Sequence, residues 1–320
     1  MKTIRLHAPN DLRLHDEPKP EPGAGEVLVR VKVVGICGSD LHWFCQAGIG
    51  DAKLEKPLIL GHEFAGVIAE GPRQGERVVA DPAIPCHTCE YCLQGNPNLC
   101  ERVRFAGHGQ EDGALREYIT WPEECLYTLP DSLSDADGAM LEPLGVAIQA
   151  VDLAHLRVGM SVGVFGCGPI GLLVIQMAHL AGAITVFATE PLTHRLEAAL
   201  SLGARQWTPD QTVDVSFEVA GENAAVETAF AAVKPGRHVI LAGIPADDRT
   251  SFSASVARRK GLTIKLVRRM KFTYPRAIQL VEHGKVDVRS LVSNRFQLDQ
   301  ARQAFMHAQR REGLKVIVEC

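Results

Sequence analysis

Alternating apolar and polar positions predict that the first part of the chain consists mainly of strands. Residues 27–34 combine β-branched and polar side chains as a half-buried strand does. The proline-rich stretch 17–23 before them can only be a loop, because proline blocks both helices and sheet ladders. Residues 58–60 and 66–69 look like further strand ends, and residues 75–79 look like a turn that enters another strand. No sustained helical period precedes residue 135.

From about residue 147 the pattern changes to short apolar runs that alternate with helical periods. The apolar runs are residues 162–165, 184–187, 213–219 and 238–242, and the helical stretches between them are residues 170–181, 194–202 and 224–233. This β-α-β-α series predicts a parallel, doubly wound sheet. After about residue 272 the sequence predicts two helices, 275–282 and 298–310, and a final strand, 314–318.

Length and charge narrow the possible functions. A chain of 320 residues suits two domains, each able to bury its own core. The net charge of -4 argues against nucleic-acid binding, and the densest basic cluster, near residues 258–269, is short. The N-terminus runs into polar residues before any apolar stretch of signal-peptide length, so we expect a cytoplasmic location.

One uncharged stretch is long enough to suggest a membrane span. Residues 161–189 contain no Asp, Glu, Lys or Arg. Glycines divide this stretch into a short apolar run, a tight turn, a helical stretch and a second apolar run. We therefore expect buried strands around a crossover helix and no membrane association.

Four clustered cysteines form the strongest motif. Nine cysteines in a chain without a secretory signal favour metal binding or catalysis over disulfides. Cys86, Cys89 and Cys92 are separated by two-residue gaps, and Cys100 follows them. Such gaps let thiolates face one point and form a closed tetrahedral zinc shell, which leaves no position for chemistry. We predict a structural zinc here; the alternative is a reduced loop whose cysteines cluster by chance.

A second group of potential metal ligands is dispersed along the chain. Cys37 lies within Gly-Ile-Cys-Gly-Ser-Asp-Leu-His, and His62 and Glu63 come directly after Gly61. One thiolate, one imidazole and one carboxylate would leave a position for water or substrate, as a catalytic zinc requires. Only the fold can bring Cys37 to His62. An isolated His-Glu pair is more often a surface pair than a ligand pair.

A glycine-rich turn joins an apolar run to a helical stretch. The residues expected to contact a dinucleotide in this turn are Gly166, Gly168, Pro169, Ile170 and Gly171. Glu190 follows about twenty residues further on, where a carboxylate accepts hydrogen bonds from the adenosine ribose. A carboxylate repels a ribose phosphate, so we expect NAD rather than NADP, although Arg195 could attract a phosphate.

These motifs together resemble the zinc-dependent medium-chain alcohol dehydrogenases, and most closely their sorbitol, xylitol and threonine dehydrogenase branch. The similarity runs from about residue 27 to the C-terminus and is most specific at residues 35–42, 61–66, 86–100, 141–150 and 166–171. It implies an α/β protein with two domains. Residues 1–146 and 272–320 would form a β-rich, GroES-like catalytic domain with a zinc lobe at 86–100. Residues 147–271 would form a Rossmann domain that binds NAD.

The resemblance also implies roles for the dispersed ligands. Cys37, His62 and Glu63 match the direct ligands of the catalytic zinc. Glu142, within Leu-Glu-Pro-Leu, matches a carboxylate that either binds the zinc or holds its water. The expected metal content is therefore one catalytic and one structural zinc.

The family further implies a proton path on the catalytic side. Ser39 would hydrogen-bond the bound alcohol, and the proton would pass by way of the nicotinamide ribose toward His42. Ordinary turn positions are the alternative for both residues.

Substrate contacts are implied more weakly. Side chains that match pocket positions of the polyol branch are Trp43, Phe44, Phe105 and Arg269, and each could instead serve packing or the surface. Met270 stands where sorbitol dehydrogenases usually have a tyrosine, which removes a hydroxyl donor and puts sorbitol itself in doubt.

The implied activity is oxidation of a secondary alcohol or polyol to a ketone, with hydride transfer to NAD. The alternative is a non-catalytic zinc- and nucleotide-binding relative with a regulatory or scaffold role, and a zinc-free quinone reductase conflicts with both metal motifs. The complete set of dispersed ligands favours the enzyme, because a binding module does not need an open zinc site. We expect a small-molecule alcohol or polyol substrate and a homo-oligomer, either a dimer or a tetramer.

Overall fold

The chain leaves its first unit, builds a second one and then returns to the first. The computed structural model describes all 320 residues. Unit one contains Met1–Glu142 and Tyr274–Cys320, and unit two contains Pro143–Thr273. The boundaries lie at 142/143 and 273/274, where the sequence predicts 146/147 and 271/272.

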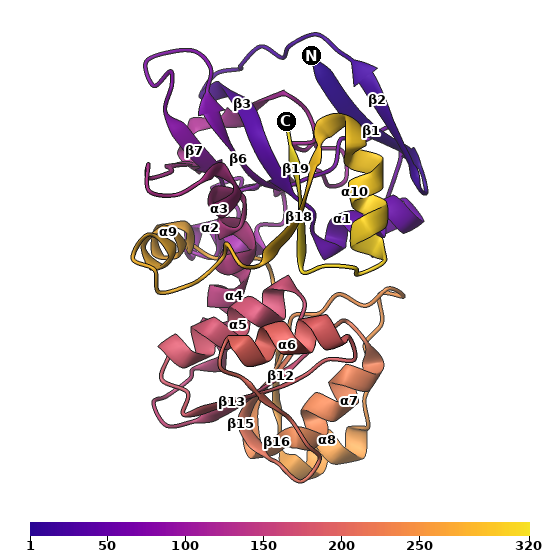
Figure 1. Ribbon diagram of the computed structural model, residues 1–320, viewed down its shortest axis with the longest axis vertical. Coiled ribbons are helices and arrows are strands. Elements are labelled where there is room, and N and C mark those ends of the chain that lie inside the picture. Colours follow the sequence, from indigo (N-terminus) through magenta and orange to yellow (C-terminus); the bar gives the residue numbers. More distant parts are fainter. The chain divides into compact units, whose positions relative to one another are not determined.

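A seven-stranded sheet organises unit one. Its strands follow the order β11-β7-β6-β3-β19-β18, and β10 also pairs with β3. In Figure 1 the yellow β19 lies beside the indigo β3, although the two strands come from opposite ends of the sequence. The strands of this sheet are β3 (Glu26–Gly35), β6 (Glu63–Ile68), β7 (Arg77–Ala80), β10 (Tyr118–Pro122), β11 (Leu126–Thr128), β18 (Val292–Gln297) and β19 (Lys315–Glu319).

Smaller elements complete unit one. The short antiparallel pairs are β1 (Lys2–Ala8) with β2 (Asp11–Asp16), β4 (Gly48–Ile49) with β5 (Ala52–Lys53), and β8 (Ala83–Ile84) with β9 (Arg104–Phe105). The α-helices are α1 (Gly38–Gln46), α2 (Glu90–Leu93), α3 (Asp135–Ala139), α9 (Tyr274–Glu282) and α10 (Ala301–Gln309). The 3-10 helices are η1 (Pro97–Leu99), η2 (Glu123–Cys125) and η3 (Leu298–Gln300).

Two predictions for unit one are wrong. Helix α1 forms well before residue 135, because its first turn is stabilised locally: the Asp40 carboxylate accepts the N–H of Cys37, the residue before the helix. Residues 58–60 form no strand; Leu58 only makes a single bridge to Leu6. Both segments are short, so neither carries enough periods for the pattern to be decisive.

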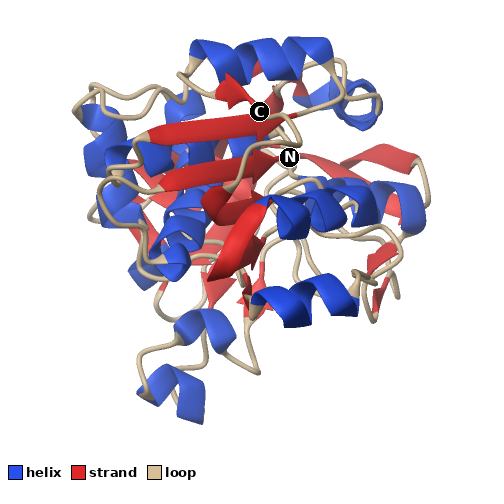
Figure 2. Cartoon of the chain, turned by 90° about the horizontal axis from the view of Figure 1, so that it is seen from below, coloured by secondary structure: helices blue, strands red, loops and turns tan.

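Unit two contains an all-parallel sheet, which confirms the predicted doubly wound architecture. The six strands follow the order β14-β13-β12-β15-β16-β17, and helices flank the strands in Figure 2. The strands are β12 (Ser161–Phe165), β13 (Thr185–Thr189), β14 (Arg205–Gln206), β15 (Val213–Glu218), β16 (Val233–Leu241) and β17 (Thr263–Leu266). The helices are α4 (Leu141–Ala154), which begins at the unit boundary, α5 (Pro169–Leu180), α6 (Thr193–Ser201), α7 (Asn223–Ala232) and α8 (Ala254–Lys260).

The uncharged stretch 161–189 forms the centre of this sheet. It consists of β12, α5 and β13, and the two strands pair in parallel. A strand buried on both faces needs no polar residues, which explains the missing charges. No helix of the protein combines the length and the apolar character needed to cross a bilayer.

The returning C-terminal segment shares the core of unit one. Phe305 on α10 is fully buried, and its ring centroid lies 5.2 Å from that of Phe44 on α1. Both belong to the same apolar cluster as strands β3 and β6. Unit one is therefore assembled from segments separated by the whole of unit two.

We expect Phe305→Ala to lower the free energy of unfolding by about 3–5 kcal/mol, because a buried aromatic leaves a cavity when it is truncated. Calorimetry or denaturant unfolding measures the loss. Phe272→Ala is the control: that ring is 62% exposed, so its loss should change stability by less than about 0.5 kcal/mol. Equal effects of the two substitutions would contradict this packing.

Candidate metal centres and nucleotide-binding turn

The four clustered cysteines come together in space. The Sγ atoms of Cys86, Cys89, Cys92 and Cys100 all lie within 4.8 Å of one another, and none forms a disulfide. They lie on the excursion between β8 and β9 that contains α2 and η1. Four convergent thiols with no open side match the donor set of a closed structural zinc site.

Hydrogen-bond donors surround the Cys86 sulfur. The N–H of Cys89 donates to it at 3.3 Å, and Arg102 Nη2 lies 3.4 Å away. Arg102 also donates to Thr88 Oγ1, which holds the guanidinium in place. The backbone N–H of Thr88, followed by that of Cys89, lowers the pKa of the Cys86 thiol to about 5. This sulfur is therefore prepared to be a thiolate, the form that binds a metal.

The dispersed ligands form a second cluster. Ligand atoms of Cys37, His62 and Glu63 lie within 4.8 Å of one another. Cys37 follows the end of β3, and Glu63 begins β6, where the antiparallel register places it opposite Gly35. His62 is 4% and Glu63 1% exposed, so they are not the surface pair considered as the alternative. Pairing of β3 with β6 thus brings the three residues together.

Asp40, to which the sequence motifs assign no role, supports this cluster. Its carboxylate is buried and accepts the N–H groups of Cys37 at 2.9 Å and Gly61 at 3.2 Å. It also lies 3.3 Å from His62 Nδ1. Burial lowers the pKa of His62, but the charges and hydrogen bonds of Asp40 and Cys37 together raise that pKa well above its usual value. A carboxylate on Nδ1 leaves Nε2 of the ring for a metal.

Two further ionisable groups lie at this centre. Lys315 on β19, which belongs to no sequence motif, forms a buried ion pair with Glu63 Oε2. Glu142, the second residue of α4, is 5% exposed, and burial raises the pKa of its carboxyl to about 8. Glu142 is close enough to interact electrostatically with His62 and Glu63, but it is not among the three residues whose ligand atoms converge within 4.8 Å.

Aromatic side chains line one side of this centre. The Phe105 ring centroid lies 5.2 Å from that of His62, so this predicted pocket residue does lie against the cluster. Trp43 is 1% exposed and donates its Nε1–H to His108 Nδ1 at 3.1 Å. Phe44 lies in the core, which favours the packing alternative for that residue.

The remaining predicted side chains have less defined surroundings. Ser39 and His42 both lie on α1 and are half-buried. Arg269 belongs to unit two, is half-buried and has a positive φ of 53°. Their roles in a proton path or in substrate contact stay predictions.

The glycine-rich turn connects β12 to α5. Gly166 has a φ of 106°, and a Cβ there would lie 2.9 Å from Ala220, so only glycine suits the position. A Cβ on Gly171 would overlap the carbonyl oxygen of Gly166. Gly168 precedes the helix, and Pro169 and Ile170 are its first residues. The turn therefore brings backbone close to the N-terminus of α5, as a phosphate-binding turn does.

Both charged residues predicted for the nucleotide lie at this turn. Glu190, directly after β13, accepts the N–H of Cys167 at 2.7 Å and that of Leu192 at 3.2 Å. Arg195 on α6 places a guanidinium nitrogen 3.7 Å from where a Cβ on Gly168 would be. The carboxylate and the guanidinium thus border the same turn.

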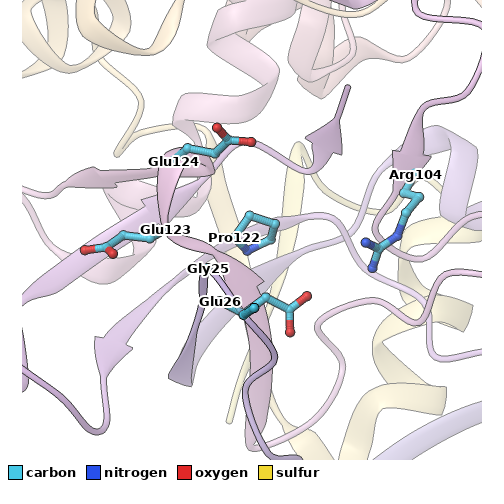
Figure 3. A pocket seen from close by; sticks show the side chains of 7 residues that line it. Gly25, Glu26, Arg104, Pro122, Glu123 and Glu124 are labelled. Carbon is cyan, nitrogen blue, oxygen red and sulfur yellow. The ribbon is translucent and has the colours of Figure 1, made fainter. Parts of the chain in front are cut away.

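A separate open hollow of about 620 Å³ lies on unit one (Figure 3). Its lining comprises residues 24–26, 104 and 122–124, and Figure 3 shows Glu26 reaching toward Arg104 across it. Arg104 forms an ion pair with Glu111. None of the predicted site residues lines this hollow, and exposed acidic groups such as these do not define a site by themselves.

Comparison with known proteins decides the family. Residues 23–131 match the alcohol dehydrogenase GroES-like domain, and residues 169–283 match the zinc-binding dehydrogenase domain. Sorbitol dehydrogenase of Bacillus subtilis (strain 168) is 34% identical, over 99% of this chain and 97% of that protein. The chain belongs to the zinc-dependent medium-chain alcohol dehydrogenases.

Solved structures of this dehydrogenase family share the whole fold. The 2R,3R-butanediol dehydrogenase from Bacillus subtilis is 30% identical, with a TM-score of 0.89 over 100% of this chain and 99% of that one. A putative zinc-binding dehydrogenase from Sinorhizobium meliloti 1021, solved with NADP, is 29% identical, with a TM-score of 0.90 over the same shares. GroES-like and Rossmann domains are thereby confirmed for this dehydrogenase.

In protein stripped of metal, we expect Cys86 to be alkylated by iodoacetamide far faster than Cys45 at pH 6. A thiol with a pKa of about 5 is roughly nine-tenths ionised at that pH, whereas burial raises the pKa of Cys45, and only the thiolate reacts. Peptide mapping by mass spectrometry measures both rates in one sample. Similar rates for the two cysteines would show that the donors around Cys86 do not stabilise its thiolate.

Proposed function

We propose that this protein is a zinc-dependent oxidoreductase that oxidises a secondary alcohol or polyol to a ketone by hydride transfer to NAD. The observation that carries the proposal is the buried convergence of Cys37, His62 and Glu63. Relatives named sorbitol dehydrogenase and 2R,3R-butanediol dehydrogenase support a polyol or a secondary alcohol as the substrate.

The residues of this centre fit a zinc ion. Sulfur, imidazole nitrogen and carboxylate oxygen are the ligands that zinc prefers, and three protein ligands leave a position for substrate. Apart from its ion pair with Lys315, the buried Oε2 of Glu63 accepts no hydrogen bond. When bound, zinc would polarise the alcohol oxygen and lower its pKa. A second zinc in the cysteine lobe would be structural, because that shell has no open position.

The protein side chains have separate tasks in this proposal. Asp40 holds His62 in the orientation that presents Nε2 to the metal. Ser39 and His42 are three residues apart on α1 and therefore share a face of the helix. Being half-buried, they suit a path that moves the proton from the substrate hydroxyl toward solvent. Phe105 packs beside His62 and would cover the carbon skeleton of the substrate.

Glu142 has a different task from the three convergent residues. Its carboxyl is buried at the same centre, outside their 4.8 Å set. We assign it to the water or hydroxyl group at the open position rather than to permanent metal ligation. Its raised pKa suits a group that hydrogen-bonds there as a donor or an acceptor.

The preference for NAD rests on Glu190. The backbone N–H groups of Cys167 and Leu192 hold its carboxylate at the turn, where its remaining lone pairs can accept two ribose hydroxyls. This carboxylate would repel a ribose phosphate, because both groups are negatively charged. The relative from Sinorhizobium meliloti was solved with NADP, so membership of the family does not decide the cofactor. Arg195 beside Gly168 would neutralise the pyrophosphate.

Cys37→Ser should lower kcat/KM with NAD and a polyol by about a thousandfold or more while the protein stays folded, because the catalytic metal loses a ligand worth several kcal/mol. Assays over a panel of polyols, secondary alcohols and amino alcohols measure the loss, and circular dichroism checks the fold. Cys45→Ser, outside both clusters, is the control and should stay within about twofold of wild type. Full activity of Cys37→Ser at trace zinc would remove the basis of the proposal.

For the cofactor, we expect wild-type kcat/KM to favour NAD over NADP by at least about tenfold, and Glu190→Ser to narrow that ratio. Without the carboxylate, Arg195 can attract the phosphate. Glu197→Ser, which removes an exposed carboxylate from the same region, should leave the ratio unchanged. Equal use of both cofactors by wild type, or an unchanged ratio in Glu190→Ser, would mean that Glu190 does not face the ribose.

A further inference from the structure

Three neighbouring strands place an anion and a cation on either side of a glycine. In the antiparallel register, Gly35 on β3 lies opposite Glu63 on β6 and opposite Ile317 on β19. Lys315 is two residues before Ile317, and side chains two residues apart in a strand point to the same face. Lys315 and Glu63 therefore approach one another across the central strand.

Gly35 makes this approach possible. A Cβ at this position would overlap Glu63 Oε2 and would lie 3.1 Å from Lys315 Cε. Any other residue in the middle strand would thus separate the two charged groups. The absence of one side chain allows the ion pair to form inside the sheet.

The ion pair is fully buried and lies among several other acidic groups. The side chains of Lys315 and Glu63 are 2% and 1% exposed. The Cys37 thiol and the Glu142 carboxyl act electrostatically on Lys315, and Asp40 is paired with His62. Lys315 forms its ion pair with one of these acidic groups, the carboxylate of Glu63. Two buried charges are costly to desolvate, so a pair at this place suggests a role beyond packing.

We propose that Lys315 is a positioning residue that competes with the metal for Glu63 and so keeps the open coordination position available to substrate. The inference rests on the proposed metal centre of Cys37, His62 and Glu63. A metal ion there must share the Glu63 carboxylate with the ammonium group, because Glu63 Oε2 is already in the ion pair. The ammonium group offsets the negative charge of the carboxylate, so Glu63 attracts the metal less strongly and can be displaced more easily.

The charge of Lys315 has opposite effects on fold and metal. Without metal, it compensates the buried Glu63 and stabilises unit one. With metal, it repels a second cation and restrains the ligand. If Lys315 served only to stabilise the fold, its substitution would lower both the stability of the protein and its retention of metal. If Lys315 competes with the metal, its substitution lowers the stability but increases the retention of metal.

The first test therefore compares Lys315→Met, which keeps the length but removes the charge, with Lys315→Arg, which keeps the charge. In metal-free protein, Lys315→Met should melt at a lower temperature than wild type. In zinc-loaded protein, transfer of the open-site zinc to a chromogenic chelator should be at least about tenfold slower in Lys315→Met, and within about threefold of wild type in Lys315→Arg. The phase of zinc release that belongs to the site of Cys37, His62 and Glu63 is the one that is missing in Cys37→Ser.

A second readout follows coordination directly in protein loaded with Co²⁺. Imidazole, a small ligand for the open position, should shift the cobalt absorption bands of wild type at a concentration at least about tenfold lower than in Lys315→Met. In Lys315→Met, the Glu63 carboxylate has lost its ion-pair partner and therefore binds the metal more tightly. Imidazole must displace this carboxylate before it can bind. A purely structural role for Lys315 would not change this titration.

The outcomes separate this inference from the proposed function. If wild type has no zinc or cobalt phase that Cys37→Ser removes, the metal centre itself is wrong. If that phase exists but Lys315→Met releases zinc as fast as wild type or faster, competition by Lys315 is wrong. Should Lys315→Met fail to fold, Lys315→Gln carries the same expectation for zinc release, because its neutral amide cannot offset the charge of Glu63. Release from Lys315→Gln at the wild-type rate overturns the inference.

Discussion

Antiparallel pairing of β19 and β6 with the two sides of β3 is the constraint on which the first unit and its centre depend. This register sets Glu63 and Ile317 opposite Gly35, and it places Cys37 just beyond the end of the shared strand. A slip of one residue would turn Glu63 or Lys315 to the other face of the sheet, since side chains alternate along a strand. The stability of the sheet and the geometry of the Cys37, His62 and Glu63 cluster therefore depend on the same strand register.

Local motifs could be predicted from the sequence, because the spacing along the chain fixes their geometry. The four cysteines lie on one short excursion, and the glycine turn lies between a strand and a helix that are consecutive. Non-local partners could not be found in this way. Asp40 was visible within the motif of Cys37, but its contact with His62 depends on strand pairing. Lys315 lies in an ordinary strand pattern, and only the register relates it to Glu63.

The same distinction applies to the fold. Buried parallel strands consist of continuous apolar runs, so β12, β13 and β15 were recognisable. Helix α1 was not, because its nine residues carry few helical periods and its first turn depends on a side-chain contact from Asp40. Phe44 on this helix belongs to the core with Phe305, a contact for which the sequence around either ring gives no indication.

The order of the segments along the chain also determines when each becomes available for folding during synthesis. Cys37, His62 and Glu63 leave the ribosome early, whereas Lys315 follows only after the whole of unit two has been synthesised. During that interval β3 lacks its β19 neighbour, and the Glu63 carboxylate lacks its cation. A nascent chain that captured a metal at this stage would hold it without the restraint of Lys315. Insertion of the second unit between β3 and β19 thus delays the completion of this sheet until the C-terminal segment has been synthesised.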